Sequence, residues 1–215
     1  MRWLAVPLLA LVLAGCGGEV RGHGTATLWV TRDRGAQVLY SGSVPAGLTA
    51  MQALERKLKV STRYGGRFVQ SIGGVSGSAS AQRDWLYFVN GIEADEGATA
   101  VHLQPGDVEW WDYRSWKGSG LSVPVVVGAF PEPFRHGFEW AKPGARVVGS
   151  GPSVAKLQSI VGRGPNAIVV SAAAPAGSAV ATREGSTVRL VLGLRAAARL
   201  AADPSAFRYR YAVPG

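Results

Sequence analysis

The chain has 215 residues, of which 47% are hydrophobic and seven are tryptophan, so it is not an intrinsically disordered protein. Its length allows one large or two small domains. The 23 basic residues outnumber the 14 acidic ones and give a net charge of +9. They are scattered without a run of five, so we expect no nucleic-acid partner. A basic surface of this kind suits anionic lipids, wall polymers or acidic ligands.

Residues 1–15 are typical of a secretory signal peptide. Arg2 precedes an uncharged stretch, Trp3 to Ala14, that is shorter than the about 20 apolar residues needed to cross a bilayer. The run Leu13-Ala14-Gly15-Cys16 resembles a bacterial lipobox, whose thiol receives a lipid, palmitate being a typical acyl chain. We therefore expect an extracytoplasmic lipoprotein, anchored to the bacterial cell membrane through its only cysteine, Cys16. The alternative is ordinary cleavage at Ala14-Gly15, which leaves Cys16 as a free thiol.

Behind a flexible tether at 16–24, residues 25–118 are predicted to form a first domain. The segment 33–35 carries a turn signal between two strands of a hairpin, and Thr49 is expected to cap a helix that carries Met51, Leu54 and Leu58. The predicted strands of this domain are 25–31, 37–41, 67–72, 84–89 and 107–113. Strands and helix are segregated along the chain, which predicts the α+β class.

The prolines of residues 119–145 predict a connector or an edge strand. Residues 146–215 are then expected to form a second, smaller α+β domain of unknown role. Its predicted strands are 146–148, 167–171 and 187–192, and its predicted helices are 154–161 and 195–202. The tail 207–211 alternates aromatic and basic residues, which predicts a half-buried strand.

Three blocks in the first domain carry a resemblance to a known family: Phe68–Val75, Asp84–Gly91 and Leu103–Trp110. In this order and at this spacing they resemble the domain family of unknown function (DUF4430) that is similar to the C-terminal domain of transcobalamin. The resemblance implies a β-grasp-like fold, a mixed sheet wrapped around one helix. It also makes a corrinoid the leading candidate ligand. Residues 123–215 resemble no family that we can name.

Aromatic residues on the last two predicted strands of the first domain are candidate ligand contacts. Side chains alternate along a strand, so one assignment packs Leu86, Phe88, Val108 and Trp110 against the helix. A ligand-binding platform of four rings then faces outward, made of Trp85, Tyr87, Trp111 and Tyr113. The alternative is that the second domain covers these rings. Asn90, in the turn Asn90-Gly91 beside the platform, completes the predicted site.

The other polar motifs of the sequence predict no metal, phosphate or catalytic site. His102 has no clustered ligand, so we expect no metal site. The segment Gly149–Ser153 lacks the fingerprint of a phosphate loop, and Pro152 with Ser153 as a cap explains it as a helix start. The chain holds no nucleophile elbow and no His-Glu-x-x-His motif. We therefore expect a protein that is not an enzyme and has no resident cofactor.

Two functional hypotheses remain from the sequence. The first is a membrane-anchored protein that binds a small ligand, a corrinoid foremost, and delivers it to a membrane transporter. The second is an envelope adaptor that docks another protein or a wall polymer through its aromatic and basic surfaces.

Overall fold

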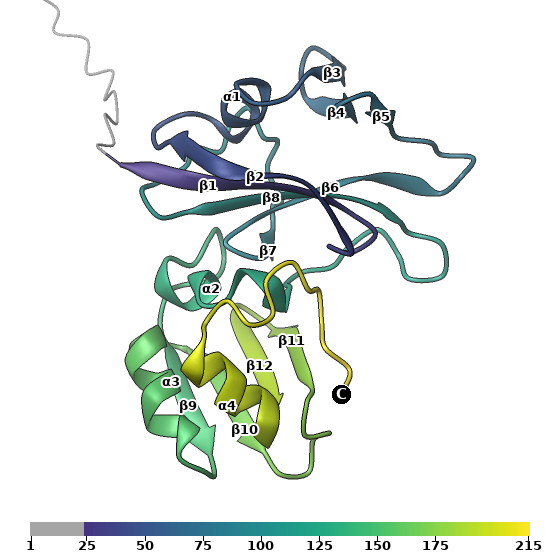
Figure 1. Cartoon of the computed structure of the whole chain (residues 1–215). Helices are drawn as coiled ribbons and strands as arrows, with labels where there is room; N and C mark the ends of the chain where they lie inside the picture. The colour runs from purple at the N-terminus through teal and green to yellow at the C-terminus, as the bar shows by residue number, and fades with distance from the viewer. Residues whose placement is uncertain (1–23) are drawn as a thin grey trace, which may run out of the picture.

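A computed structural model describes residues 24–215, so the predicted signal peptide, most of the tether and Cys16 lie outside the described residues. The described chain forms sheets of five, three and four strands. Figure 1 shows the three-stranded sheet above the five-stranded one, and the four-stranded sheet with its helices below. None of the helices within 24–215 is long and apolar enough to span a membrane.

The five-stranded sheet, in the order β2-β1-β8-β6-β7, belongs to the predicted first domain. Its strands are β1 (Thr25–Arg32), β2 (Gln37–Pro45), β6 (Arg83–Val89), β7 (Ile92–Glu93) and β8 (Val108–Ser115). The expected hairpin is present: β1 pairs antiparallel with β2, and Asp33, Arg34 and Gly35 all have positive φ in the turn. β1 pairs parallel with β8, and such a pair needs a long crossover.

The crossover begins with α1 (Ala50–Glu55) and continues through a small sheet of β3 (Val60–Arg63), β4 (Phe68–Ile72) and β5 (Val75–Ser76). Thr49 caps α1 as predicted: its hydroxyl accepts from the Gln52 amide at 3.1 Å, and the Gln52 side chain accepts from the Thr49 amide. Met51 and Leu54 are buried, whereas Leu58 lies beyond the end of the helix. A mixed sheet with one helix on one face confirms the α+β class.

The prediction of which face of this sheet packs against the helix is wrong. Trp85, Tyr87, Trp111 and Tyr113 pack on the same side as α1, while the opposite face carries Leu86, Phe88, Val108 and Trp110. Alternation fixes which residues share a face but not which face the helix covers. Both faces are rich in aromatic rings, so hydrophobicity alone could not distinguish them.

The second sheet has the order β11-β12-β10-β9, with β9, β10 and β12 parallel and β11 antiparallel. Its elements are β9 (Ala145–Gly149), α3 (Ser153–Val161), β10 (Asn166–Ser171), β11 (Ala179–Glu184), β12 (Thr187–Gly193) and α4 (Leu194–Ala202). Alternate residues such as Ile168 and Leu190 are buried against Leu157 of α3 and Leu200 of α4. Pro152, not Ser153, occupies the N-cap of α3, and Ser153 is its first helical residue.

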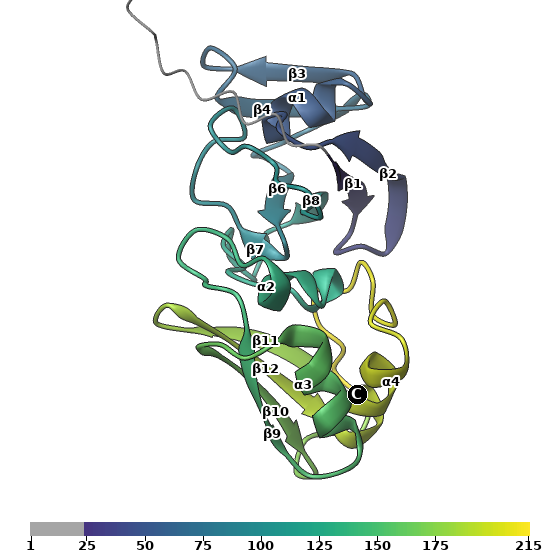
Figure 2. The same cartoon turned by 90° about the vertical axis from the view of Figure 1, so that its left-hand side faces the viewer.

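The predicted connector contributes to the core. It contains η1 (Val127–Ala129) and α2 (Glu132–Arg135) and forms no edge strand. Its residues 125–130 are all buried, and Figure 2 shows α2 between the two large sheets. Val125 and Phe134 pack into the core of the second sheet, while Val126 and Ala129 pack against the first. Apolar residues between the prolines explain why this segment is buried.

The tail 207–211 consists of turns and irregular backbone, so the predicted strand is wrong. Its alternation is as expected, because Phe207 is buried, Tyr209 and Tyr211 are half-buried, and Arg208 and Arg210 are exposed. Tyr209 has a φ of 65°, which no regular strand allows. Its ring lies 4.9 Å from that of Trp29, and the Tyr211 ring lies 5.5 Å from that of Trp110. The tail thus covers the aromatic face of the first sheet that points away from α1.

Candidate functional site

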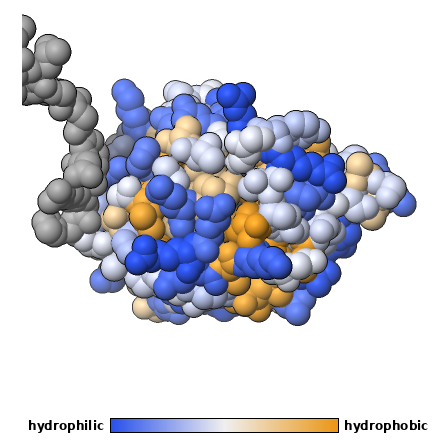
Figure 3. Space-filling view, turned by 90° about the horizontal axis from the view of Figure 1, so that it is seen from above, coloured by the Kyte–Doolittle hydropathy of each residue, from blue (hydrophilic) through white to orange (hydrophobic). Residues whose placement is uncertain are grey.

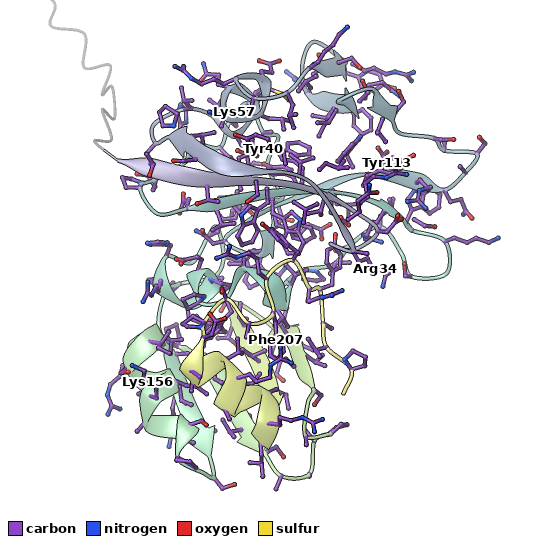
Figure 4. The ribbon with its side chains drawn as sticks, viewed as in Figure 1. Arg34, Tyr40, Lys57, Tyr113, Lys156 and Phe207 are labelled. Carbon is purple, nitrogen blue, oxygen red and sulfur yellow. The ribbon has the colours of Figure 1, made fainter. Side chains whose placement is uncertain are left out.

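The four rings predicted as an open platform lie inside the first domain. Trp85, Trp111 and Tyr113 are buried, and Tyr87 is half-buried. The Tyr87 and Trp111 rings stack at 4.7 Å with an interplanar angle of 16°, and Trp85 lies 5.2 Å from Tyr113. The structure therefore brings the four rings together but buries them beneath α1 and the β3–β5 layer. Figure 4 shows Tyr113 on this upper side of the sheet.

The polar atoms of these rings already have partners in neighbouring segments. Trp85 Nε1 donates to the Val75 carbonyl at 2.9 Å, and Tyr113 Oη donates to the Ser76 carbonyl at 2.9 Å. Tyr87 Oη donates to the Glu96 carbonyl at 2.5 Å. Burial, together with the nearby carboxylates of Glu139 and Glu109, raises the pKa of the Tyr87 phenol. Each bond ties the sheet to a segment above it, so these atoms have a structural role.

Glu109, two residues before Trp111 on β8, carries a fully buried carboxyl. Its Oε1 accepts from Trp111 Nε1 at 2.5 Å, whereas Oε2 has no hydrogen-bond partner among the described residues. Burial raises the pKa of Glu109 to about 8, against the smaller lowering effect of the Trp111 bond. The residue is therefore protonated at neutral pH. Sequence analysis missed it, because a Glu among aromatic strand residues gives no sign of its burial.

Three of the predicted residues line a small pocket above the sheet. Trp85, Tyr87 and Trp111 form its floor, and its volume is about 110 Å³. Arg67 and Phe68 from the β3–β4 hairpin stand at its rim. A pocket of this size holds a few atoms and cannot enclose a macrocycle.

A larger, shallow groove of about 470 Å³ adjoins this pocket and shares Phe68 and Trp85 with it. It follows the outer side of β6, where β7 pairs only with Phe88 and Val89. The groove is lined by Phe68, Asp84, Trp85, Leu86, Glu93, Ala94, Asp95, Leu121 and Ser122. We call this the β6 groove.

The rim of the β6 groove is acidic in a protein that is basic overall. Asp84 accepts from the Trp85 amide at 2.8 Å, and burial raises the pKa of its carboxyl. Glu93 accepts from the Ser122 hydroxyl and the Val123 amide, and so fixes the far wall. Leu121 is 57% exposed there. The groove thus offers apolar area together with hydrogen-bond acceptors.

Asn90 does not join the aromatic site. It has a φ of 53°, as expected for its turn, and its buried amide Nδ2 donates to Asp107 Oδ1 at 2.8 Å and to the Gly137 carbonyl at 3.0 Å. Its Oδ1 accepts from the Val108 amide. These bonds hold the β6–β7 turn to the start of β8 and to the connector.

The histidines form no metal centre within residues 24–215, where no cluster of three metal-ligating side chains occurs. His102 lies beside the Ala100 carbonyl. His136 pairs with Glu132 at 2.9 Å and approaches Asp107 at 4.0 Å. Burial raises the pKa of Glu132, and the neighbouring His136 opposes this effect.

A second cavity, of about 360 Å³, lies between the first sheet and the C-terminal tail. Thr27, Trp29 and Ser41 form its sheet side, and Ser205 and Arg208 come from the tail. The Arg208 guanidinium stands 5.6 Å over the Trp29 ring. We call this the tail cleft.

The arrangement of strands and helix defines a small α+β domain of the β-grasp-like type. Residues 47–115 match the model of a family described as a domain of unknown function (DUF4430), and this segment includes all three blocks of the resemblance. The match confirms the family similarity over about a third of the chain. No curated protein matches the chain.

Two solved structures show local similarity. A candidate metal-binding protein from Ruminococcus gnavus ATCC 29149 aligns with 15% identity and a TM-score of 0.36 over 43% of this chain and 97% of its own. Haptocorrin in complex with Cbi aligns with 13% identity and a TM-score of 0.35 over 42% of this chain and 25% of its own. At TM-scores this low, neither neighbour assigns a ligand to this chain.

Proposed function

We propose that the protein is a non-enzymatic binding protein of the bacterial cell envelope, with the β6 groove as its ligand site. The supporting observation is the groove itself, which combines apolar area from Phe68, Trp85 and Leu121 with the carboxylates of Asp84 and Asp95. Ligand sites characteristically join apolar walls to a few convergent polar groups. In this proposal a lipid on Cys16 holds the protein at the outer side of the membrane, and a membrane transporter receives the ligand.

A corrinoid is the leading ligand in this proposal. Its flat macrocycle suits an open groove that covers one side of the ligand, and its peripheral amides are donors that suit the carboxylates at the rim. The choice of this ligand class comes from the resemblance of Phe68–Val75, Asp84–Gly91 and Leu103–Trp110 to the family that is similar to the C-terminal domain of transcobalamin. The buried platform cannot serve, so contact would be made at the rim of the small pocket and along β6.

Isothermal titration calorimetry with cyanocobalamin tests the proposal on residues 24–215, which contain every described helix and strand. We expect saturable heat for the unmodified protein and at least a tenfold weaker affinity for Leu121→Ala. Leu194→Ala is the matched control, because Leu194 is 44% exposed on α4 outside the groove. A third variant, Arg208→Ala, probes the tail cleft.

The outcomes separate the sites and the hypotheses. Loss of affinity in Arg208→Ala but not in Leu121→Ala would place the ligand in the tail cleft and refute the groove assignment. No heat from any variant would refute corrinoid binding. If the protein binds no corrinoid but co-purifies with an envelope protein or a wall polymer, the adaptor hypothesis is favoured.

A further inference from the structure

The β3–β4 hairpin and the end of α1 gather basic side chains on one face. Residues 55–67 contain five basic residues and one acidic residue. All five basic side chains are exposed: Arg56, Lys57, Lys59, Arg63 and Arg67. None of them takes part in an ion pair within the described part of the chain. We call this surface the hairpin face.

Two aromatic rings stand among these charges. Tyr64 is 77% exposed at the tip of the hairpin, and Phe68 is 40% exposed at the start of β4. Their rings lie 6.4 Å apart in an edge-on arrangement. Tyr64 has a φ of 54°, and a Cβ built at Gly65 or Gly66 would meet no atom within 4 Å. The tip therefore projects away from the rest of the protein.

The hairpin face points away from the second domain. Figure 1 shows α1, β3 and β4 above the first sheet, with the second sheet on its other side, and Figure 3 looks down on this face, where hydrophilic residues surround apolar patches. Figure 4 shows Lys57 beside α1 and Lys156 on α3, at the opposite end of the molecule. The basic and aromatic surface is thus free to meet a flat partner.

We infer that the hairpin face docks on an anionic lipid bilayer. Basic side chains are attracted to acidic headgroups, and exposed tyrosine and phenylalanine rings partition into the interfacial region. A wall polymer could satisfy the charges, but it offers no apolar layer for Tyr64 and Phe68. The described chain begins beside the segment that leads into α1, because the Gly24 carbonyl accepts from the Ala46 amide, four residues before the helix.

The lipid anchor of the proposed function fits this geometry without being needed for it. Cys16 precedes Gly24 by eight residues, which span at most about 28 Å when extended. A membrane-anchored chain could therefore rest its hairpin face on the bilayer and leave the second domain pointing outward. The inference stands on the hairpin alone and would survive a failure of corrinoid binding.

Vesicle co-sedimentation of residues 24–215 tests the inference without the anchor. The vesicles are phosphatidylcholine with or without phosphatidylglycerol, at low and high salt. We expect binding only to vesicles with phosphatidylglycerol, and release at high salt. The double variant Lys57→Gln, Arg63→Gln should bind about 25-fold more weakly, at about fivefold for each basic residue. The control Lys156→Gln, Arg163→Gln removes the same charge from exposed residues of the second domain and should bind normally.

A third variant separates a bilayer from a soluble polyanion. Tyr64→Asn suits the positive φ and leaves the charge unchanged, so it should weaken vesicle binding but not binding to soluble polyphosphate. Equal loss in the hairpin and control double variants would show non-specific charge attraction and overturn the inference. Normal vesicle binding by Tyr64→Asn, together with tight polyphosphate binding, would indicate a wall polymer and would also overturn it.

Discussion

Tyr211 donates a 3.0 Å hydrogen bond from its hydroxyl to Oδ2 of Asp112, and so joins the C-terminal tail to the middle of the first sheet. Asp112 is fully buried and also accepts from the Thr31 hydroxyl and from the Arg34 and Gly35 amides. One carboxylate therefore links the β1–β2 turn, β8 and the tail. The second domain is held to the first through this clasp and through the connector.

Removing the Tyr211 hydroxyl tests the clasp. We expect Tyr211→Phe to lower the free energy of unfolding by about 1–2 kcal/mol, because a buried carboxylate loses one of its donors. Urea denaturation followed by fluorescence measures the change. Tyr64→Phe is the matched control, since Tyr64 is 77% exposed, and should change stability by less than about 0.5 kcal/mol. If Tyr211→Phe lowers the free energy of unfolding no more than Tyr64→Phe does, the hydrogen bond between Tyr211 and Asp112 does not stabilise the fold.

The buried carboxyl of Glu109 makes the stability of the folded protein depend on pH. Its pKa is raised from 4.5 to about 8 in the folded state, so folding favours the protonated carboxyl. The contribution of Glu109 to the free energy of unfolding is fully present below pH 4.5. It is lost as the pH rises towards 8, at about 1.4 kcal/mol for each pH unit between these values. We expect Glu109→Gln to be more stable than the unmodified protein at pH 8 by a few kcal/mol and similar to it at pH 4.5.

Denaturation of the Glu109 variant at several pH values measures this difference. Glu55→Gln provides the control, since Glu55 is an exposed residue of α1, and its curve should follow that of the unmodified protein. A constant difference between Glu109→Gln and the unmodified protein from pH 4.5 to 8 would contradict the assigned ionisation.

Asn90 is expected to act in folding and not in ligand contact. Asn90→Ala removes three buried hydrogen bonds and puts alanine, which tolerates positive φ less well than asparagine, at a φ of 53°. It should lower the free energy of unfolding by about 2–3 kcal/mol. Asn90→Gly suits this φ and isolates the loss of the hydrogen bonds. Both variants should keep the ligand affinity of the folded protein. If Asn90→Ala is stable but has lost its affinity for the ligand, Asn90 belongs to the ligand site after all.

The anchor can be tested in cells. Cys16→Ser should move the protein from the membrane fraction to the periplasm or medium, because the acyl chains supply most of the binding energy. Fractionation and immunoblotting follow the protein. If Cys16→Ser stays in the membrane pellet even after the charges of the hairpin face are removed, the lipobox interpretation is wrong.

Much of the fold could be predicted from local patterns. The cap at Thr49, the β1–β2 turn and the long apolar strands β1, β6, β8, β10 and β12 each carry a strong local signal. Strands β3, β5, β7 and β11 were not predicted. Val60–Arg63 has one apolar residue, and two-residue strands such as β5 and β7 depend on pairing partners that are distant in sequence.

The site was harder to predict because it depends on tertiary contacts. The period of β6 and β8 correctly groups Trp85 with Tyr87 and Trp111 with Tyr113, but only the path of the crossover decides that α1 covers them. The burial of Glu109 has the same origin. The β6 groove is lined by Leu121 from a loop and Phe68 from the hairpin. No pattern in the sequence predicts that these two residues lie near each other.

Hydrogen–deuterium exchange with cyanocobalamin tests most directly whether the β6 groove is the ligand site. We expect slower exchange in peptides that cover 84–95 and 119–123 when the ligand is present, and unchanged exchange in the tail at 204–210. Protection confined to the tail and to the sheet side of the tail cleft, or no protection at saturating ligand, would contradict the account.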